Sequence, residues 1–271
     1  MEVIASTYMF HGSRLGREHL GAMKESSLEA AEVFCIREHF DWTDADHVRQ
    51  VLEASRSLEV RIESFHAPWD EQNSYDISVP DRSRRERALG QIRSAIDVLS
   101  NMGGKVFVIH PGGGVAEDRE RSLRLACSVA SLREIGRYAR GRGVTLVIEN
   151  PAPPDLGSTA AELDGIIQGV KGDEGSFCLD VGHAHLSPGG IPAFVELGYA
   201  PLVVHLSDNR GSEDDHLPPP QGSIDWETTF SSLRTGFSGR AQRICYNLEL
   251  ETFPGSERLQ ALRTWVESRA R

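Results

Sequence analysis

Residues 144–151 read VTLVIENP, and residues 176–185 read SFCLDVGHAH. Both stretches run through apolar residues and then reach an acid, Glu149 or Asp180, just before a turn. A continuous apolar run is typical of a parallel strand that is buried on both faces. An unpaired acid at the end of such a strand would cost on the order of several kcal/mol, so a cation or a hydrogen-bond cluster is expected beside it.

The same design recurs elsewhere, because other strand-like runs also end on residues that can bind a metal. These runs are VRIESFHAP with His66, KVFVIHPGGG with His110, PLVVHLSDN with His205 and RICYNLELE with Glu249 and Glu251, and SFCLDVGHAH adds His183. Polar residues that recur at the ends of buried strands point to one shared rim. A mixture of imidazoles and carboxylates favours Zn, Mn or Co over Ca, which prefers oxygen ligands alone. The sequence therefore predicts a metal site.

Strand-like runs alternate with helical patterns eight times along the chain. The predicted strands cover residues 3–9, 31–36, 59–65, 105–110, 144–149, 176–181, 202–207 and 244–250. The segments between them repeat apolar residues at helical spacing, as at Leu89, Ile92, Ile96 and Leu99. Eight βα units are typical of an α/β fold of the (β/α)8 TIM barrel type, predicted as a single domain over residues 1–271. The carboxyl ends of all strands meet on one face of such a barrel, where catalytic sites lie.

Local signals predict several helix boundaries. Asp44 and Ser158 are the predicted N-caps, and Gly103, Gly143 and Gly172 are the predicted C-caps. Each of these residues is of a type that favours a helix terminus, and each lies where a helical pattern borders a non-helical segment.

Composition excludes some classes of partner. A formal net charge of −11 argues against a broad surface for nucleic acid, and no run of about 18 apolar residues predicts a membrane span. Residues 1–16 lack the basic start of a signal peptide, and the four cysteines show no spacing of a disulfide framework or zinc ribbon. We therefore expect a cytoplasmic protein, and the sequence leaves a homo-oligomer open.

Other conspicuous residues have structural interpretations. The histidines outside the strand-end runs, His11, His19, His39 and His47, are expected to be surface or packing residues. His185 lies two residues after His183, which we take as the site member of the pair. The glycines at 112–114 can cradle a phosphate or simply allow a tight turn.

Several short motifs together resemble a known superfamily. They are HAP (66–68), HPG (110–112), IENP (148–151), LDVGHA (179–184) and, above all, HLSDNRGSEDDHLPPPQGSIDW (205–226) followed by a strand with Glu. The chain thereby resembles the xylose isomerase-like TIM barrel superfamily, which joins sugar-phosphate isomerases and epimerases to endonuclease IV (AP endonuclease family 2). The resemblance covers nearly the whole chain and is most specific in its second half.

The two branches of this superfamily imply different metal contents. In the isomerase and epimerase branch, the resemblance implies one divalent metal, Mn, Co, Zn or Mg, held by Glu149, Asp180, His205 and Glu249. In the endonuclease IV branch it implies three zinc ions and nine ligands, the additional ones being His66, His110, His183, Asp214 and His216. The last ligand of the first group stays open, because the strand end selects Glu249 and alignment with the endonuclease pattern selects Glu251.

The isomerase branch implies proton transfer next to a carbonyl in a carbohydrate or a related polyol or acid. The metal would polarise the carbonyl and stabilise an enediolate, while Glu149 and Glu249 remove and return the proton. His183 would hold a substrate hydroxyl, and Arg210 would reach a distal hydroxyl, carboxylate or phosphate. Trp69 and Trp226, just past predicted strand ends, are candidates to close the pocket.

Two alternatives remain. An endonuclease IV-like phosphodiesterase acting on abasic DNA would use the additional five residues as metal ligands instead of substrate contacts. The loops HAPWDEQNSYD, HPGGGVAEDRE and SDNRGSEDDH are mostly acidic, which favours a small-molecule substrate over DNA. A barrel that binds a sugar or a metal without turnover is the third class, and the complete ligand set argues against it.

Overall fold

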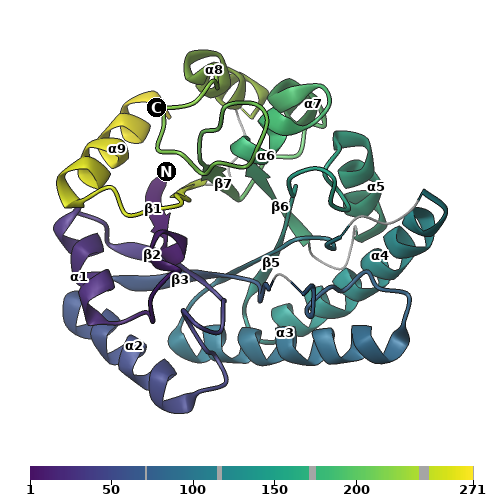
Figure 1. Cartoon of the computed structure of the whole chain (residues 1–271), viewed down its shortest axis with the longest axis horizontal. Coiled ribbons are helices and arrows are strands. Elements are labelled where there is room, and N and C mark those ends of the chain that lie inside the picture. Colours follow the sequence, from purple (N-terminus) through teal and green to yellow (C-terminus); the bar gives the residue numbers. More distant parts are fainter. Residues whose placement is uncertain (71, 115–117, 171–174, 238–243, 271) are drawn as a thin grey trace.

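Eight parallel strands form a closed barrel in the computed structural model of this chain (Figure 1). The structure describes residues 1–70, 72–114, 118–170, 175–237 and 244–270. The strands are β1 (Glu2–Ser6), β2 (Ala30–Phe34), β3 (Arg61–His66), β4 (Val106–Ile109), β5 (Thr145–Glu149), β6 (Gly175–Asp180), β7 (Val203–Leu206) and β8 (Cys245–Leu248). They pair in sequence order, and β8 closes on β1 with Cys245 opposite Glu2 and Leu248 opposite Ala5. The predicted (β/α)8 TIM barrel is confirmed.

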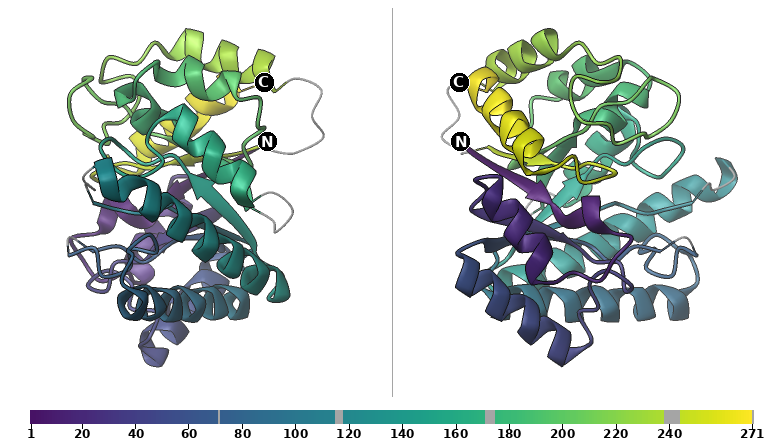
Figure 2. Two further views of the ribbon diagram at one scale, coloured as in Figure 1. Left: turned by 90° about the vertical axis from the view of Figure 1, so that its right-hand side faces the viewer. Right: turned by 60° about the vertical axis from the view of Figure 1, so that its left-hand side comes forward.

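Helices surround the barrel (Figures 1 and 2). They are α1 (Arg17–Glu25), α2 (Ala45–Leu58), α3 (Arg82–Met102), α4 (Asp118–Gly141), α5 (Ala160–Val170), α6 (Val181–Leu186), α7 (Gly190–Glu196), α8 (Trp226–Gly236) and α9 (Ser256–Arg269), with a 3-10 helix, η1 (Thr7–Phe10), after β1. The apolar repeat at Leu89, Ile92, Ile96 and Leu99 is the buried face of α3, as its spacing predicted. None of the helices in the described ranges has the length and apolar character needed to cross a bilayer.

Strand alternation decides which residues face the barrel interior. In β5, Leu146 and Ile148 pack in the large core beneath the helices, whereas Val147 belongs to a small interior cluster with Val108, Cys178 and Val203. Because successive side chains point to opposite faces, the residue two positions after each interior residue also faces inward. This register places strand-end polar side chains together above the apolar floor of the barrel.

β1 and β6 end earlier than the sequence predicts, at residues 6 and 180 instead of 9 and 181, because a side chain at each of these ends caps a helix. Ser6 accepts a hydrogen bond from the backbone N–H of Tyr8 (3.2 Å), so β1 gives way to η1 instead of continuing to residue 9. Asp180 accepts a hydrogen bond from the N–H of His183 (2.6 Å) and starts α6. The short helix α6 escaped the sequence analysis because six residues are too few to show a helical repeat.

Most predicted helix boundaries are confirmed. The confirmed positions are Asp44 before α2, Gly103 after α3 and Gly143 after α4. Ser158 is wrong by one residue, because the hydroxyl that receives the N–H of Glu162 in the first turn of α5 belongs to Thr159 (3.3 Å). Gly172 lies outside the described residues.

Both chain termini lie near each other, on one side of the barrel (Figure 2). Since β1 starts from the N-terminus, this side holds the amino ends of the parallel strands. Their carboxyl ends face the opposite side, where the long loop of residues 207–225 joins β7 to α8. Any site built from strand ends is therefore on the face opposite the termini.

Candidate metal centre

The core set consists of four buried side chains at the carboxyl ends of adjacent strands: Glu149, Asp180, His205 and Glu249. His205 Nδ1 lies 2.8 Å from Glu249 Oε2, 3.0 Å from Glu149 Oε1 and 3.8 Å from Asp180 Oδ2. The strand register thus gathers three carboxylates around one imidazole nitrogen. These are the four residues that the resemblance implied as ligands of one metal.

Glu249, and not Glu251, completes the core set in this structure. Glu249 follows the last residue of β8 directly and is buried. Glu251 has a side chain that is 46% exposed, and its ionisable partners among the described residues include Tyr8 and, at 3.8 Å, His11. The two positions share the inward phase of β8, but the chain has already left the barrel at residue 251.

The outer set consists of the other five predicted ligands: His66, His110, His183, Asp214 and His216. In its first group, Glu149 Oε2 lies 3.2 Å from His66 Nε2 and 3.4 Å from His110 Nε2. Glu149 therefore faces the core set with one oxygen and these two imidazoles with the other. Such a carboxylate is positioned to connect two neighbouring groups of ligands.

The second group of the outer set is centred on Asp214 in the loop between β7 and α8. Its Oδ2 lies 2.9 Å from His183 Nε2 and 3.0 Å from His216 Nε2. His183 comes from α6, so the group joins a helix to a loop that follows the next strand. All five residues of the outer set therefore lie at one end of the barrel with the core set.

Backbone carbonyls orient three imidazoles of the outer set. The Nδ1 atom of His183 lies 2.9 Å from the backbone oxygen of Asn150. The Nδ1 atom of His216 lies 3.2 Å from that of Glu249, and the Nδ1 atom of His66 lies 3.2 Å from that of Ala67. A carbonyl oxygen can only accept, so Nδ1 carries the hydrogen in these contacts. Nε2 is then the atom left to face a metal ion or a substrate.

Strong mutual interactions shift the pKa values of these residues. Burial would raise the pKa of Glu249, but the positive charge of His205 and its hydrogen bond hold this pKa at about 2. Burial raises the pKa of Asp180 to about 6. Burial would lower the pKa of His216, but the hydrogen bond and charge of Asp214 raise it to about 9. In the absence of a metal, bound protons therefore offset part of the negative charge.

Unpaired atoms test whether these residues fit a metal. Within the described part of the chain, the buried atoms without an aligned hydrogen-bond partner include Glu149 Oε2, Asp180 Oδ2, Glu249 Oε2, Asp214 Oδ1 and His110 Nε2. Buried polar atoms are nearly always paired in folded proteins. Groups of three donors from both sets also have ligand atoms within 4.8 Å of one another. The residues fit divalent cations that accept nitrogen and oxygen ligands, such as Zn, Mn or Co.

A cavity of about 170 Å³ opens over both sets. It is lined by Tyr8, Phe34, His66, Trp69, His110, Ala152, Asp155, His183, Asp214, His216 and Glu249. The rings of Tyr8 and Phe34 pack against each other with centroids 4.8 Å apart, and the indole of Trp69 is 44% exposed. Among the described residues that line this cavity there is no Lys or Arg.

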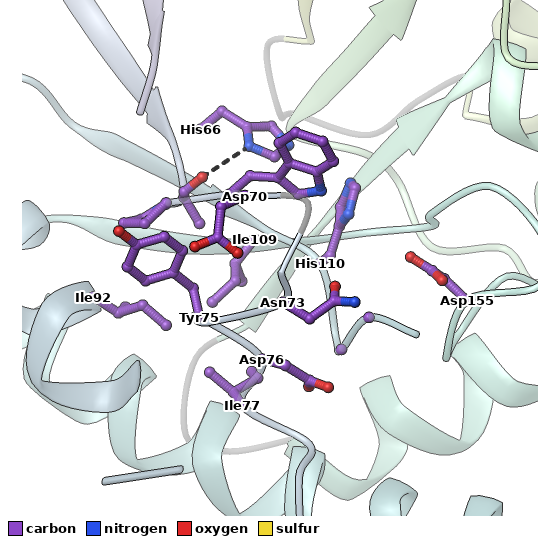
Figure 3. A pocket seen from close by; sticks show the side chains of 15 residues that line it. His66, Asp70, Asn73, Tyr75, Asp76, Ile77, Ile92, Ile109, His110 and Asp155 are labelled. Carbon is purple, nitrogen blue, oxygen red and sulfur yellow. Dashed lines mark hydrogen bonds between the residues drawn. The ribbon is translucent and has the colours of Figure 1, made fainter. Parts of the chain in front are cut away.

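A second cavity adjoins the first beneath the loop between β3 and α3 (Figure 3). His66, Trp69, His110 and Asp155 line both cavities. Figure 3 shows Asp155 on the same side of this pocket as His110. The sequence analysis missed Asp155; its only signal was an acid six residues after Glu149 in the loop after β5.

The glycine run at 112–114 packs closely against the loop between β3 and α3. A Cβ at Gly112 would come within 2.5 Å of Ser78 Oγ, and a Cβ at Gly113 within 2.6 Å of Asn73 Oδ1. The backbone N–H of Gly114 donates to Asp155 Oδ1 (3.1 Å). Close approach of two loops accounts for the glycines at 112 and 113, whereas Gly114 has the positive φ (76°) that favours glycine.

Two predicted substrate contacts lie away from the cavity lining. Trp226 was expected to close the pocket; this is wrong, because its indole is buried and donates to Asp208 Oδ2 (2.8 Å). As the first residue of α8, Trp226 packs in the core beside Trp265. Arg210 is 64% exposed in its side chain, pairs with Asp215 at 3.0 Å, and lines neither cavity.

The remaining histidines have local partners. His39 and His47 are buried, and each contacts a backbone carbonyl, that of Ser13 or of Leu15. This agrees with the packing role that the sequence analysis expected. His185 contacts Ser223 Oγ (3.1 Å) and does not line the cavities, so His183 is the member of this pair that joins the site.

Glu32 is a buried acid that the sequence analysis overlooked. It faces the barrel interior from the middle of β2, and its Oε1 lies 3.3 Å from His205 Nε2. Glu32 lies within its strand and not at the end, so the strand-end pattern does not include it. An acid inside the apolar run AAEVF was the signal that could have revealed it.

Sequence comparisons relate the chain to a family and to individual proteins. The family model described as xylose isomerase-like TIM barrel matches residues 20–267. An uncharacterised protein of Methanocaldococcus jannaschii is 29% identical over 79% of this chain and 74% of its own length. A probable endonuclease 4 of Malacoplasma penetrans is 24% identical over 66% of this chain and 65% of its own length.

Structural comparison gives a match over the whole chain. The crystal structure of a D-tagatose 3-epimerase-like protein superposes with a TM-score of 0.84 at 22% identity, covering 100% of this chain and 98% of that one. At this identity the match establishes the shared fold, and the residues of the site carry the functional argument.

Proposed function

The chain belongs to the xylose isomerase-like TIM barrel family, and from this premise we propose that it is a divalent-metal-dependent isomerase or epimerase. Its substrate class is a carbohydrate, or a related polyol or acid, and its predicted setting is the cytoplasm. The structural neighbour described above is a sugar epimerase-like protein, which supports this branch of the family.

The lining of the cavity carries the proposal. Tyr8 and Trp69 offer aromatic faces suited to the C–H surface of a sugar, and Asp155 offers a carboxylate that can accept from hydroxyl groups. Among the described lining residues there is no Lys or Arg to contact a nucleic-acid backbone. A small, hydroxylated, uncharged ligand suits these groups better than a phosphodiester chain.

The core set would hold the metal through Glu149, Asp180, His205 and Glu249. A divalent ion bound there supplies Lewis acidity, which makes a proton next to a carbonyl easier to remove. Glu249 lines the cavity, and its carboxylate lies beside His205 (2.8 Å), so it is placed to take or return that proton.

Glu149 would share the proton transfer from beneath the cavity. It is fully buried, and its Oε2 faces His66 and His110, which line the cavity. A substrate carbon held against Glu249 and Glu149 can lose its proton to one carboxylate and regain it from the other, which gives epimerisation. In isomerisation the proton returns to the neighbouring carbon instead. His183 and Asp214 would orient substrate hydroxyls at the rim.

A second candidate function rests on the outer set. His66 and His110 meet at Glu149, and His183 and His216 meet at Asp214, so the outer set forms two groups that suit additional metals. The similarity to a probable endonuclease 4 points in the same direction. Two or three metals there would support phosphodiester hydrolysis.

One experiment separates the two candidates. Protein reconstituted with Mn, Co or Zn would be incubated in deuterium oxide with a panel of ketoses, and NMR would follow exchange of the proton next to the carbonyl. We expect exchange in the wild type, its loss in Glu249→Gln and one metal per chain. Cleavage of abasic-site DNA by protein with three zinc ions, without exchange in any ketose, would overturn the isomerase proposal.

A further inference from the structure

We propose that Glu32 is a positioning residue for metal binding, because its carboxylate holds His205 with Nδ1 directed at the core set. This inference rests on the metal dependence proposed above. It concerns a residue that neither lines the cavity nor lies at a strand end. The two nitrogen atoms of His205 face different surroundings.

Nδ1 of His205 faces the core set, and Nε2 faces Glu32. Nδ1 is within 3.0 Å of both Glu249 Oε2 and Glu149 Oε1. On the opposite side of the ring, Nε2 lies 3.3 Å from Glu32 Oε1. A neutral imidazole carries its hydrogen on one nitrogen and offers a lone pair on the other. Metal binding through Nδ1 therefore requires the hydrogen on Nε2, beside Glu32.

The environment of His205 differs from that of the outer imidazoles. His66, His183 and His216 each direct Nδ1 at a backbone carbonyl. His205 is fully buried in the barrel wall, and its Nε2 has no aligned hydrogen-bond partner in the part of the chain that the structure describes. Since buried N–H groups are rarely left without an acceptor, Glu32 Oε1 takes the place that a carbonyl has for the others.

Two side chains hold Glu32 in place beneath His205. Ser64 on β3 donates its hydroxyl hydrogen to Glu32 Oε2 (2.7 Å), and Asn247 on β8 donates from Nδ2 to Glu32 Oε1 (2.7 Å). Both donors face the interior of the barrel from neighbouring strands of Glu32 or His205. The carboxylate is thus fixed from two sides before any metal binds.

Two other assignments explain these contacts less well. Glu32, His205 and Glu249 have donor atoms close enough to share a metal. Both oxygens of Glu32, however, already accept hydrogen bonds from Ser64 or Asn247, which a metal would have to displace. Cys178 also approaches His205, but a thiol is a weak acceptor.

Two substitutions of Glu32 separate positioning from simple charge. Glu32→Asp keeps the negative charge but withdraws the oxygen by one methylene, and Glu32→Gln keeps the length but removes the charge. We expect both to weaken Zn²⁺ binding at the core set by about 10–100-fold, as is usual for the hydrogen-bond partner of a metal-bound histidine. Competition with a chelator measures the dissociation constant for Zn²⁺. During a zinc titration, the NMR signals of the His205 ring identify the step at which zinc binds to the core set.

Asp208→Asn is the matched control. Asp208 is also a buried carboxylate, with hydrogen bonds to Trp226 and to backbone N–H groups, but it has no contact with the ligands. We expect this variant to lose stability and keep its zinc affinity. In the zinc-loaded wild type, the Nε2–H proton of His205 should be visible at low field and should move in both Glu32 variants.

Three results would overturn the proposal. If Glu32→Asp binds zinc like the wild type while Glu32→Gln does not, charge alone is responsible. If both variants bind like the wild type, Glu32 is only a structural residue. If the wild type binds no Zn²⁺, Mn²⁺ or Co²⁺ at all, the proposed function fails together with this inference, whereas the first two results leave the proposed function intact.

Discussion

The core set and the outer set differ in the way that the fold holds them. Strand register directs Glu149, Asp180 and His205 inward from β5, β6 and β7, so the barrel itself fixes their positions. In the outer set, Asp214 lies on a loop with its side chain 26% exposed, and His110 lies just past β4 with its side chain 24% exposed. The core set is therefore mainly a property of the barrel, whereas the outer set combines His66 on β3 and His183 on α6 with two residues, His216 and Asp214, whose positions depend on the conformation of the β7–α8 loop.

Glu149→Gln should have the largest effect, because Glu149 contacts both sets. We expect proton exchange to fall by about 10³-fold or more, since the variant removes a proton-transfer group and weakens the metal site. The exchange rate in deuterium oxide, together with metal analysis, measures both losses.

Glu251→Gln serves as the matched control for that variant. Glu251 lies beyond β8, exposed, and outside the core set. We expect its exchange rate to stay within a few-fold of the wild type. A large loss in Glu251→Gln with little loss in Glu249→Gln would mean that the last ligand has been assigned to the wrong residue.

The same contrast explains how much the sequence could predict. The barrel and the core set follow from local information, because an acid or histidine at the end of an apolar run keeps its inward phase in any parallel strand, as Asp180 and His205 do. Glu32 has the same phase, but nothing in the sequence brings it beside His205, since that contact depends on barrel closure.

Loop residues were harder to predict for a physical reason. Arg210 lies in the long connection between β7 and α8, and Trp226 is the first residue after it, yet Trp226 is buried against Asp208 and Arg210 points to solvent. Both destinations depend on the path of the β7–α8 loop, which carries no periodic pattern. The strand-end rule could therefore place a residue near the rim without deciding whether its side chain enters the cavity.

The pH dependence of stability should distinguish the two sets in metal-free protein. The pKa of His216 is raised to about 9, so its stabilising contribution is complete below its ordinary pKa of about 6.5 and is lost as pH rises through about 9. The pKa of Glu249 is lowered to about 2, so its contribution is lost as pH falls from about 4.5 toward 2. Each effect is at most roughly 3 kcal/mol.

The loss of stability at alkaline pH can be measured by urea unfolding of chelator-treated protein. The free energy of unfolding would be determined between about pH 6 and 10, a range that spans the raised pKa of His216. We expect His216→Gln to be less stable at pH 6 and to lose less stability as pH rises. If the metal replaces the proton at His216, the free energy of unfolding of zinc-loaded protein should depend less on pH in the alkaline range. An unchanged slope in His216→Gln would remove this residue from the explanation.

Asp214→Asn tests whether the outer set binds metal or substrate. Removing the charge that pairs with His183 and His216 should raise KM for a polyol substrate by about 10–100-fold, as expected for a lost charge-assisted hydrogen bond of 1.5–3 kcal/mol. The metal content should stay at one per chain. A fall from three zinc ions to two would instead identify the outer set as a metal site.

Arg210→Ala should have the smallest effect on activity, and the size of this effect should depend on whether the substrate carries a phosphate. Arg210 pairs with Asp215 at the surface, and an exposed ion pair of this kind contributes about 0–1 kcal/mol. For an uncharged sugar we therefore expect kcat/KM to change by less than about fivefold. A phosphorylated sugar could recruit the exposed guanidinium, since Arg binds phosphate through paired hydrogen bonds. Comparing each sugar with its phosphate in wild type and variant separates these cases: a loss confined to the phosphate ester would place the phosphate at Arg210, whereas equal, small changes would leave this residue outside the binding site.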